Sequence, residues 1–259
     1  MGMFFADDSY DESRRMHGFQ RYKQLLSFYA GRWLKANLLA TAGALPLAAG
    51  IALSIATSSV LVLIPASLVG GAVFGPFLAA LYDAILRGLR DAPGGWWANY
   101  RRAWHQNWKA SLLPGALDGL LAGLYAFMLY VMWSAQVFPG WGTIAVYLFG
   151  ALLLLGLNSL YWPQLVLFQQ GNRARIYNAV LFTMKYFWPV MGAALLQLGY
   201  LLVYLLFAPW TLILVPFLGL WFILFLSEFL LYDRLNDALQ IEAQYVTVEG
   251  DPWREDDGE

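Results

Sequence analysis

The chain has 259 residues, of which 60% are hydrophobic and only 13% are charged, and its formal net charge is −1. Soluble domains carry about a quarter charged residues, so this composition excludes an ordinary soluble protein and indicates a surface that faces lipid. The chain has no cysteine, which excludes disulfides, iron–sulfur clusters and thiol catalysis.

The N-terminal segment "MGMFFADDSYDES" carries acidic residues before any apolar run and is followed by no small-residue cleavage site. It does not resemble a secretory signal, so we expect the mature chain to begin near Met1. Residues 1–14 are predicted to form a disordered acidic tail. The following segment predicts an amphipathic helix, because apolar residues recur at helical spacing at Tyr22, Leu25, Leu26, Tyr29 and Trp33.

Six apolar windows predict six transmembrane helices in an all-α membrane protein. A helix of about 20 apolar residues crosses a hydrocarbon core about 30 Å thick. The windows are approximately 34–56, 60–82, 112–134, 143–168, 187–208 and 210–232. They predict one transmembrane domain over 15–240, followed by a second disordered acidic tail over 241–259.

The distribution of lysine and arginine predicts how the chain is oriented. All sixteen of these cations fall before or at the start of the first window, after the last, or in the connections that follow the second and fourth windows. The other three connections, "TSS", "SAQVFPGW" and "AP", carry none. Because cations are retained on the cytoplasmic side during insertion, we expect a multi-pass protein of the cytoplasmic membrane with both termini in the cytoplasm.

The segment "GGWWANYRRAWHQNWKAS" at 94–111 predicts a second amphipathic helix, and its aromatic stripe consists of Trp97, Tyr100, Trp104 and Trp108. Cations occupy the opposite side and flank, which is typical of a helix in the lipid headgroup plane. Alternatively, the stripe packs against the protein's own cytoplasmic helices. Nucleic-acid binding is disfavoured because base stacking needs an exposed platform in a strongly basic surface.

The same spacing recurs before the fifth window, at Tyr177, Val180, Leu181, Met184 and Trp188. The recurring spacing therefore predicts three parallel helix-hairpin repeats. Each repeat has an interfacial helix that ends in tryptophan, an outward span, a short turn and a returning span. In this interpretation Trp33, Trp108 and Trp188 are equivalent interfacial residues.

Small residues at four-residue spacing mark helix-packing faces. They include Gly115, Gly119 and Gly123 in the third span and Ala36, Ala40, Ala44 and Ala48 in the first. In lipid, small residues allow helix backbones to approach closely. These stripes are most simply internal contacts, and the alternative is a docking surface for another membrane subunit.

Asp118 is the leading candidate for an intramembrane polar site, because a carboxylate well inside a span requires polar or protein surroundings. We expect Asp118 either to be protonated or to form a hydrogen bond with Asn158 or with Gln197, which fall at similar depths, while Glu228 lies nearer the cytoplasmic boundary. Such a cluster can bind a cation, a proton or a sugar hydroxyl. The alternative is a network that only fixes helix packing.

Motifs for chemistry are otherwise missing from the sequence. The two histidines, His17 and His105, are too few and too far apart for an evident metal site, and no catalytic triad or phosphate-binding loop occurs. We therefore expect no cofactor and no enzymatic activity. A membrane enzyme acting on lipid or lipid-linked sugar would have to rely on Asp118 or Glu228.

The run "GPFLAALYDAILRGLRDAPGGWWANYRRAWHQNWKASLLPGAL" at 75–117 resembles the YesL-like family of bacterial membrane proteins. The shared features are a Gly-Pro pair in the second span, a short connector, and aromatic residues with "QNWKAS" before the third span. With the order of six spans, the resemblance covers about residues 15–240. It implies an integral membrane protein without an assigned activity, associated with bacterial carbohydrate uptake systems, and it supplies no catalytic residue.

Two functions follow as hypotheses from the residues and the resemblance. The first is a nonenzymatic component that assists a transport system, either by binding a permease through the Gly and Ala stripes or by responding to the membrane through the interfacial helices. The second is a small transporter or channel with its polar site around Asp118. In both, the lipid bilayer is the first partner, and transport-system membrane subunits are the expected protein partners.

Overall fold

The structure is a computed structural model that describes residues 18–92, 94–136 and 138–242. The predicted tail at 1–14 and nearly all of the one at 241–259 lie outside these residues. Every element of the described chain is a helix. In chain order they are α1 (Gly18–Ala56), α2 (Val60–Leu89), α3 (Trp96–Ser134), α4 (Trp141–Leu167), α5 (Asn172–Lys185), α6 (Phe187–Leu206), η2 (Trp210–Leu214) and α7 (Val215–Leu239).

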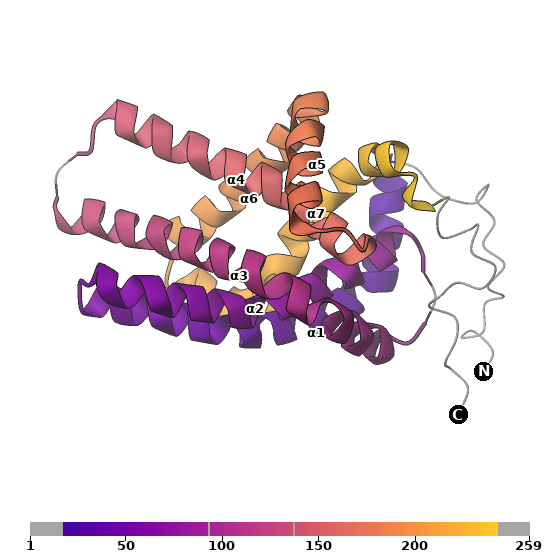
Figure 1. Cartoon of the computed structure of the whole chain (residues 1–259), viewed down its shortest axis with the longest axis horizontal. Helices are drawn as coiled ribbons and strands as arrows, with labels where there is room; N and C mark the ends of the chain where they lie inside the picture. Colours follow the sequence, from indigo (N-terminus) through magenta and orange to yellow (C-terminus); the bar gives the residue numbers. More distant parts are fainter. Residues whose placement is uncertain (1–17, 93, 137, 243–259) are drawn as a thin grey trace.

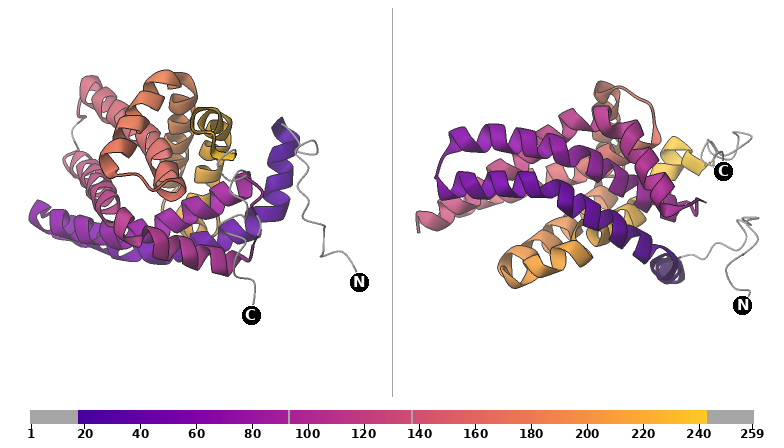
Figure 2. Two further views of the ribbon diagram at one scale, coloured as in Figure 1. Left: turned by 45° about the vertical axis from the view of Figure 1, so that its right-hand side comes forward. Right: turned by 90° about the horizontal axis from the view of Figure 1, so that it is seen from below.

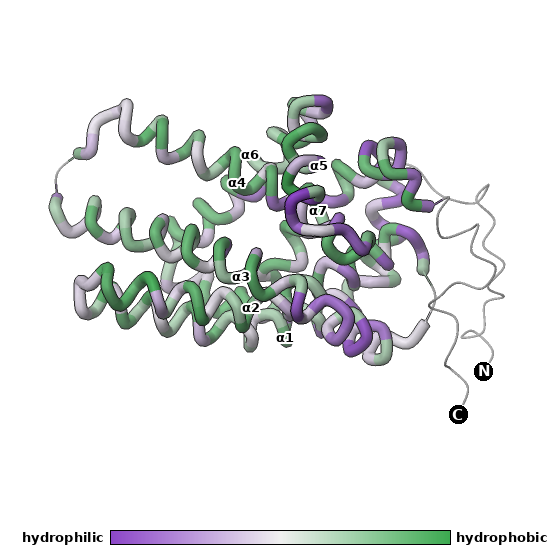
Figure 3. Tube along the Cα trace, viewed as in Figure 1, coloured by the Kyte–Doolittle hydropathy of each residue, from purple (hydrophilic) through white to green (hydrophobic). Residues whose placement is uncertain are grey.

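Six of these segments are long and apolar enough to cross a membrane, which confirms the predicted all-α membrane fold. They are α1, α2, α3, α4, α6 and η2 with α7. Figure 3 shows apolar residues along the middle of the bundle and hydrophilic residues gathered toward one end. The connections made by Thr57–Ser59 and by residues 207–209 fall where the sequence predicts the outer turns.

The helices form three consecutive hairpins, α1–α2, α3–α4 and α6–α7 (Figure 1). Helices α1 to α4 run roughly side by side, and the α6–α7 hairpin leans away from them, as the right-hand view of Figure 2 shows. Helix α5 runs across the spans. The first turns of α1 also turn away from the rest of that helix (Figure 2).

The predicted interfacial segments precede the three hairpins, but they join them in different ways. The first two are continuous with their spans, since α1 begins at Gly18 and α3 at Trp96. The third is a separate helix, because Tyr186 leaves the helical conformation with φ −114° and ψ 42° between α5 and α6. The three units therefore share an order of elements and differ in geometry.

Helices α2 and α3 form the closest contact of the bundle through opposed glycines. A Cβ added to Gly119 would lie 2.5 Å from Cα of Gly71, and one added to Gly115 would lie 2.7 Å from Cα of Gly75. One added to Gly123 would lie 2.2 Å from Oγ of Ser67. The predicted glycine stripe is thus an internal packing face, and it leaves no room for a partner subunit.

The predicted alanine stripe of α1 is only partly internal. Ala36 and Ala40 are fully buried, whereas Ala44 is half-buried and Ala48 is exposed. Close contact between α1 and α2 is made instead by Gly43 against Phe77 and by Leu47 against Gly70. The stripe therefore contributes to packing at its first two positions and faces outward at its last.

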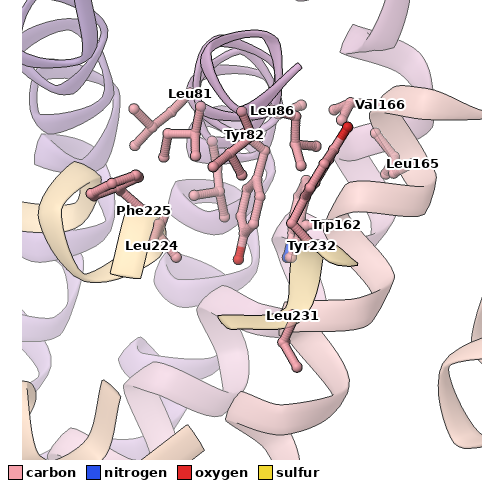
Figure 4. Packing of buried hydrophobic residues seen from close by; sticks show 14 of the residues in the cluster. Leu81, Tyr82, Leu86, Trp162, Leu165, Val166, Leu224, Phe225, Leu231 and Tyr232 are labelled. Carbon is pink, nitrogen blue, oxygen red and sulfur yellow. The ribbon is translucent and has the colours of Figure 1, made fainter. Parts of the chain in front are cut away.

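The hydrophobic core lies where α1, α2, α4 and α7 meet, toward the basic end of the bundle. Figure 4 shows part of it, including Tyr82 of α2 beside Trp162 of α4, with Phe225 and Leu231 of α7. Ile241 is also fully buried, so ordered packing continues just past residue 240. This core anchors the base of the α6–α7 hairpin while its other end leans outward.

We expect Gly119→Val to lower the free energy of unfolding by about 1–3 kcal/mol, because the added side chain meets backbone atoms of α2 that have no room to move. Unfolding in a detergent–dodecyl sulfate titration measures the change. The matched control is Gly199→Val in α6, where an added Cβ has nothing within 4 Å, and its effect should stay below about 0.5 kcal/mol. Equal losses in both variants would contradict the internal role of the stripe.

Candidate functional site

Asp118 of α3 forms hydrogen bonds with two side chains of α4. Its Oδ1 accepts from Nδ2 of Asn158 at 3.1 Å, and its Oδ2 accepts from Nε1 of Trp162 at 2.8 Å. The predicted pairing of Asp118 with Asn158 is therefore present. Trp162 was not among the predicted partners, although a tryptophan inside a span needs an acceptor for its indole N–H when it is buried.

Gln197 of α6 lies apart from this pair and binds a different residue. Its Nε2 donates to Oγ of Ser159 at 2.6 Å, and that hydroxyl donates to the carbonyl of Leu155. Asn158 and Ser159 are neighbours on α4, so their side chains point to different sides of the helix, one toward α3 and one toward α6. The prediction that Gln197 bonds to Asp118 is wrong for this reason.

Glu228 of α7 is fully buried, and neither carboxyl oxygen has a hydrogen-bond partner among the described residues. Tyr82 lies within electrostatic range of both Glu228 and Asp118. It also stacks on Trp162, with 6.1 Å between the ring centroids. Glu228 thus occupies the core beside the Asp118 cluster rather than joining its hydrogen bonds.

A groove of about 730 Å³ runs along α3, α4 and α6 on the outer side of Asp118. Asp118 and Asn158 line it at the end nearer the core, and Trp133, Phe138 and Pro139 line it near the outer turn. Because 15 residues of α3 separate Asp118 from Trp133, the groove is about 22 Å long. Its walls between these ends are almost entirely apolar.

Two tyrosines hold α3 and α4 together along this groove. Tyr147 donates its hydroxyl to the carbonyl of Tyr125 at 2.6 Å, and Tyr125 donates to the carbonyl of Tyr147 at 3.3 Å. Their rings lie 4.4 Å apart, between centroids. These bonds satisfy both hydroxyl hydrogens, so the rings present mainly apolar surface to the groove.

Helix α7 is broken at Gly219, whose φ of −39° and ψ of −112° are not helical. The side chain of Asn37, fully buried in α1, replaces the backbone hydrogen bonds lost at the break. It donates to the carbonyls of Val215 and Pro216 and accepts from the N–H groups of Leu220 and Trp221, at 2.8–3.1 Å. The break is therefore a fixed feature of the fold.

The predicted interfacial residues separate into buried and exposed groups. Trp33 is fully buried, donates its Nε1–H to the carbonyl of Ala84 at 2.9 Å and stacks near Phe225, with 4.5 Å between centroids. Tyr100 is also buried, and Trp104 packs against the core. For Trp33 and Tyr100, the alternative interpretation of packing against the protein's own helices is the correct one.

Trp97, Trp108 and Trp188 remain exposed, as expected of residues that contact lipid. The apolar stripe of α5 is exposed along its whole length, and we call it the α5 face. It consists of Tyr177, Val180, Leu181 and Met184 of α5, together with Trp188 at the start of α6. The opposite side of α5 packs inward through Arg175, Ala179 and Thr183.

At the basic end, α1 is joined to the connector between α2 and α3 by polar contacts. Arg21 forms an ion pair with Asp91 and donates to the carbonyl of Leu89 at 3.1 Å, and Tyr29 donates to Asp91. Within α2, Asp83 and Arg87 form a buried ion pair at 2.7 Å. The described residues contain no group of three or more histidine, aspartate or glutamate side chains placed to hold a metal ion.

Comparison of the chain with protein-family models, with curated proteins and with solved structures found no match in any of the three.

We expect Asn37→Ala to destabilise the protein by about 3 kcal/mol or more, because it leaves two N–H groups and two carbonyls unpaired at a buried helix break. The same detergent–dodecyl sulfate titration measures the loss. Asn107→Ala serves as the control, since Asn107 only donates to Ala103 one turn back in its own helix. If the two variants lose similar stability, Asn37 does not hold the break.

Proposed function

We propose that the chain is a nonenzymatic membrane component that assists a transport system. The resemblance of residues 75–117 to the YesL-like family suggests a carbohydrate uptake system in the bacterial cytoplasmic membrane. In this proposal both termini lie in the cytoplasm, because the basic connections are on that side. The observation that carries the proposal is the exposure of the entire α5 face.

The glycine contacts argue against a permease binding through the Gly stripe and favour the interfacial helices as the surface that this component uses. Gly115 and Gly119 are in backbone contact with α2, so the stripe they belong to is occupied within the molecule. The α5 face has no such internal partner. Tyr177 is 64% exposed, Met184 73% and Trp188 81%, so apolar side chains of this segment are open to the surroundings.

Exposed apolar surfaces of this kind mark sites of membrane or protein interaction. Helix α5 runs across the spans, as an interfacial helix does (Figure 1). Arg173 and Lys185 lie at its two ends, where they can reach anionic headgroups or an acidic partner surface. The equivalent stripes of α1 and α3 are partly buried through Trp33 and Tyr100, so α5 is the unit best placed to contact a partner.

We expect a triple variant with Tyr177, Val180 and Met184 changed to serine to lose its transport partner. Gentle-detergent copurification of the full chain from native membranes, followed by mass spectrometry, measures the amount of transport subunit recovered. About a tenfold decrease would correspond to the loss of these apolar contacts. Phe28→Ser provides the control, since Phe28 is 71% exposed on α1 and lies outside the α5 face.

Recovery of the wild-type chain alone, with no transport subunit enriched, would refute the accessory role. Equal recovery with the triple variant and with Phe28→Ser would place the contact elsewhere.

The second candidate function is a small transporter or channel, and it is favoured by the contact of Asp118 with Asn158 at the inner end of the groove. An intramembrane carboxyl group that faces a cavity is typical of substrate and ion pathways. The hydrogen bonds of Asp118 to α4 also fit the alternative, a network that fixes packing. A flux measurement distinguishes transport from a purely structural role.

For this candidate, we expect Asp118→Asn to lower proton flux into proteoliposomes about tenfold, because the substitution removes the ionisable group. An entrapped pH-sensitive dye reports the flux under an imposed potassium gradient. Asp233→Asn, at an exposed carboxyl outside the groove, is expected to keep the wild-type rate. Identical flux with and without the Asp118 carboxyl would remove Asp118 from any proton pathway.

A further inference from the structure

Among the described residues, one acidic side chain and no basic one line the groove. The carboxyl of Asp118 lies at its inner end and is half-buried, so it remains accessible from the groove. Its two hydrogen-bond donors, Asn158 and Trp162, are both neutral groups. They orient the carboxylate without compensating its charge.

Apart from Asp118 and Asn158, the residues that line the groove are leucine, alanine, isoleucine, methionine, proline and aromatic residues. Every lysine and arginine of the chain falls outside the six apolar windows or at their edges, so no cation of the spans reaches this depth. A carboxylate in apolar surroundings interacts strongly with a nearby positive charge, because little water screens it. The groove is thus complementary to a ligand that is apolar over most of its surface and carries one positive charge.

We infer that this groove binds a lipophilic organic cation, with the charged centre next to Asp118 and the apolar body along α3, α4 and α6. Aromatic rings add to the attraction, since Tyr125, Tyr147 and Phe138 line the walls and cations are attracted to ring faces. The ligand class is therefore an amphipathic amine, ammonium or phosphonium compound.

The size of the groove fits a small organic molecule. Its volume of about 730 Å³ lies within the range of about 300–1,000 Å³ that is typical of small-molecule sites. The lateral opening, where Leu201 and Leu205 are about half-exposed, gives such a ligand access from the bilayer.

Inorganic cations fit the groove less well. Calcium takes about six to eight oxygen ligands and magnesium about six, whereas the inner end offers the carboxylate of Asp118 and the side-chain carbonyl of Asn158. The hydroxyls of Tyr125 and Tyr147 lie further along and are directed at backbone carbonyls. An organic cation needs no such coordination shell, because the apolar walls surround its body.

The test compares two ions of nearly the same shape and size but opposite charge, tetraphenylphosphonium and tetraphenylborate. Equilibrium binding of each to the purified full chain in nonionic detergent is measured by calorimetry, with micelles alone as the blank. We expect saturable binding of one tetraphenylphosphonium per chain and no saturable binding of tetraphenylborate. Saturable binding of both ions with similar affinity would overturn the proposal, because the groove would then select shape and not charge.

Two variants test the location of the site. Asp118→Asn is expected to weaken tetraphenylphosphonium binding at least tenfold, and Ala122→Trp is expected to abolish it by filling the groove while Asp118 stays in place. Asp233→Asn is the matched control with an unchanged affinity. Unchanged affinity in Ala122→Trp would overturn the assignment even if Asp118→Asn fails to fold.

This inference concerns binding and does not depend on the accessory role proposed above. It supplies a ligand class for the second candidate function. Because binding is measured in detergent without a gradient, a chain that binds tetraphenylphosphonium but carries no flux would keep the ligand assignment and lose the transporter function. A chain that binds neither ion would refute the assignment and leave the α5 face unaffected.

Discussion

The close approach of α2 and α3 at their glycines determines most of the remaining arrangement. Gly71 and Gly75 of α2 meet Gly115 and Gly119 of α3 with almost no side-chain volume between the backbones. Because the face of α3 that carries these glycines is turned toward α2, the adjacent face, about 100° further round the helix, is turned toward α4. Asp118 and Ala122 lie on that face, and the groove begins there.

Helices α3 and α4 are separated by a space because the residues between them are larger than those between α2 and α3. Where glycines oppose each other the helices touch, whereas Tyr125 and Tyr147 keep α3 and α4 apart while bonding to each other's backbone. The α6–α7 hairpin leans away from α1 to α4 (Figure 2), and the groove runs along α3, α4 and α6 toward the outer turn. The fold is therefore tightly packed at its basic end and more open toward its outer end.

The positions of the six spans could be predicted from the sequence because each depends only on a local run of apolar residues. The glycine contact and the Asp118–Asn158 pair were also predictable, the first from four-residue spacing and the second from similar depth in neighbouring spans. Local pattern fails where burial depends on distant helices. Trp33 and Trp188 occupy equivalent places in their segments, yet Trp33 is covered by Phe225 of α7 and Trp188 is 81% exposed. The break at Gly219 escaped prediction for the same reason, because the residue that stabilises it is 182 positions away in the chain.

The polar residues inside the spans differ in whether the protein's own groups satisfy all of their hydrogen-bonding capacity and charge. This difference separates structural roles from binding roles. The side-chain amide of Asn37 forms hydrogen bonds with four backbone groups of α7, so no donor or acceptor remains for a ligand. Gln197 donates an N–H to Ser159 where α4 packs against α6. Asp118 accepts two hydrogen bonds from neutral donors, and these leave its carboxylate charge unpaired at the surface of a groove. A cation bound in the groove would offset the cost of a carboxylate charge inside the membrane, and Asp118 lines the groove where such a ligand can reach it.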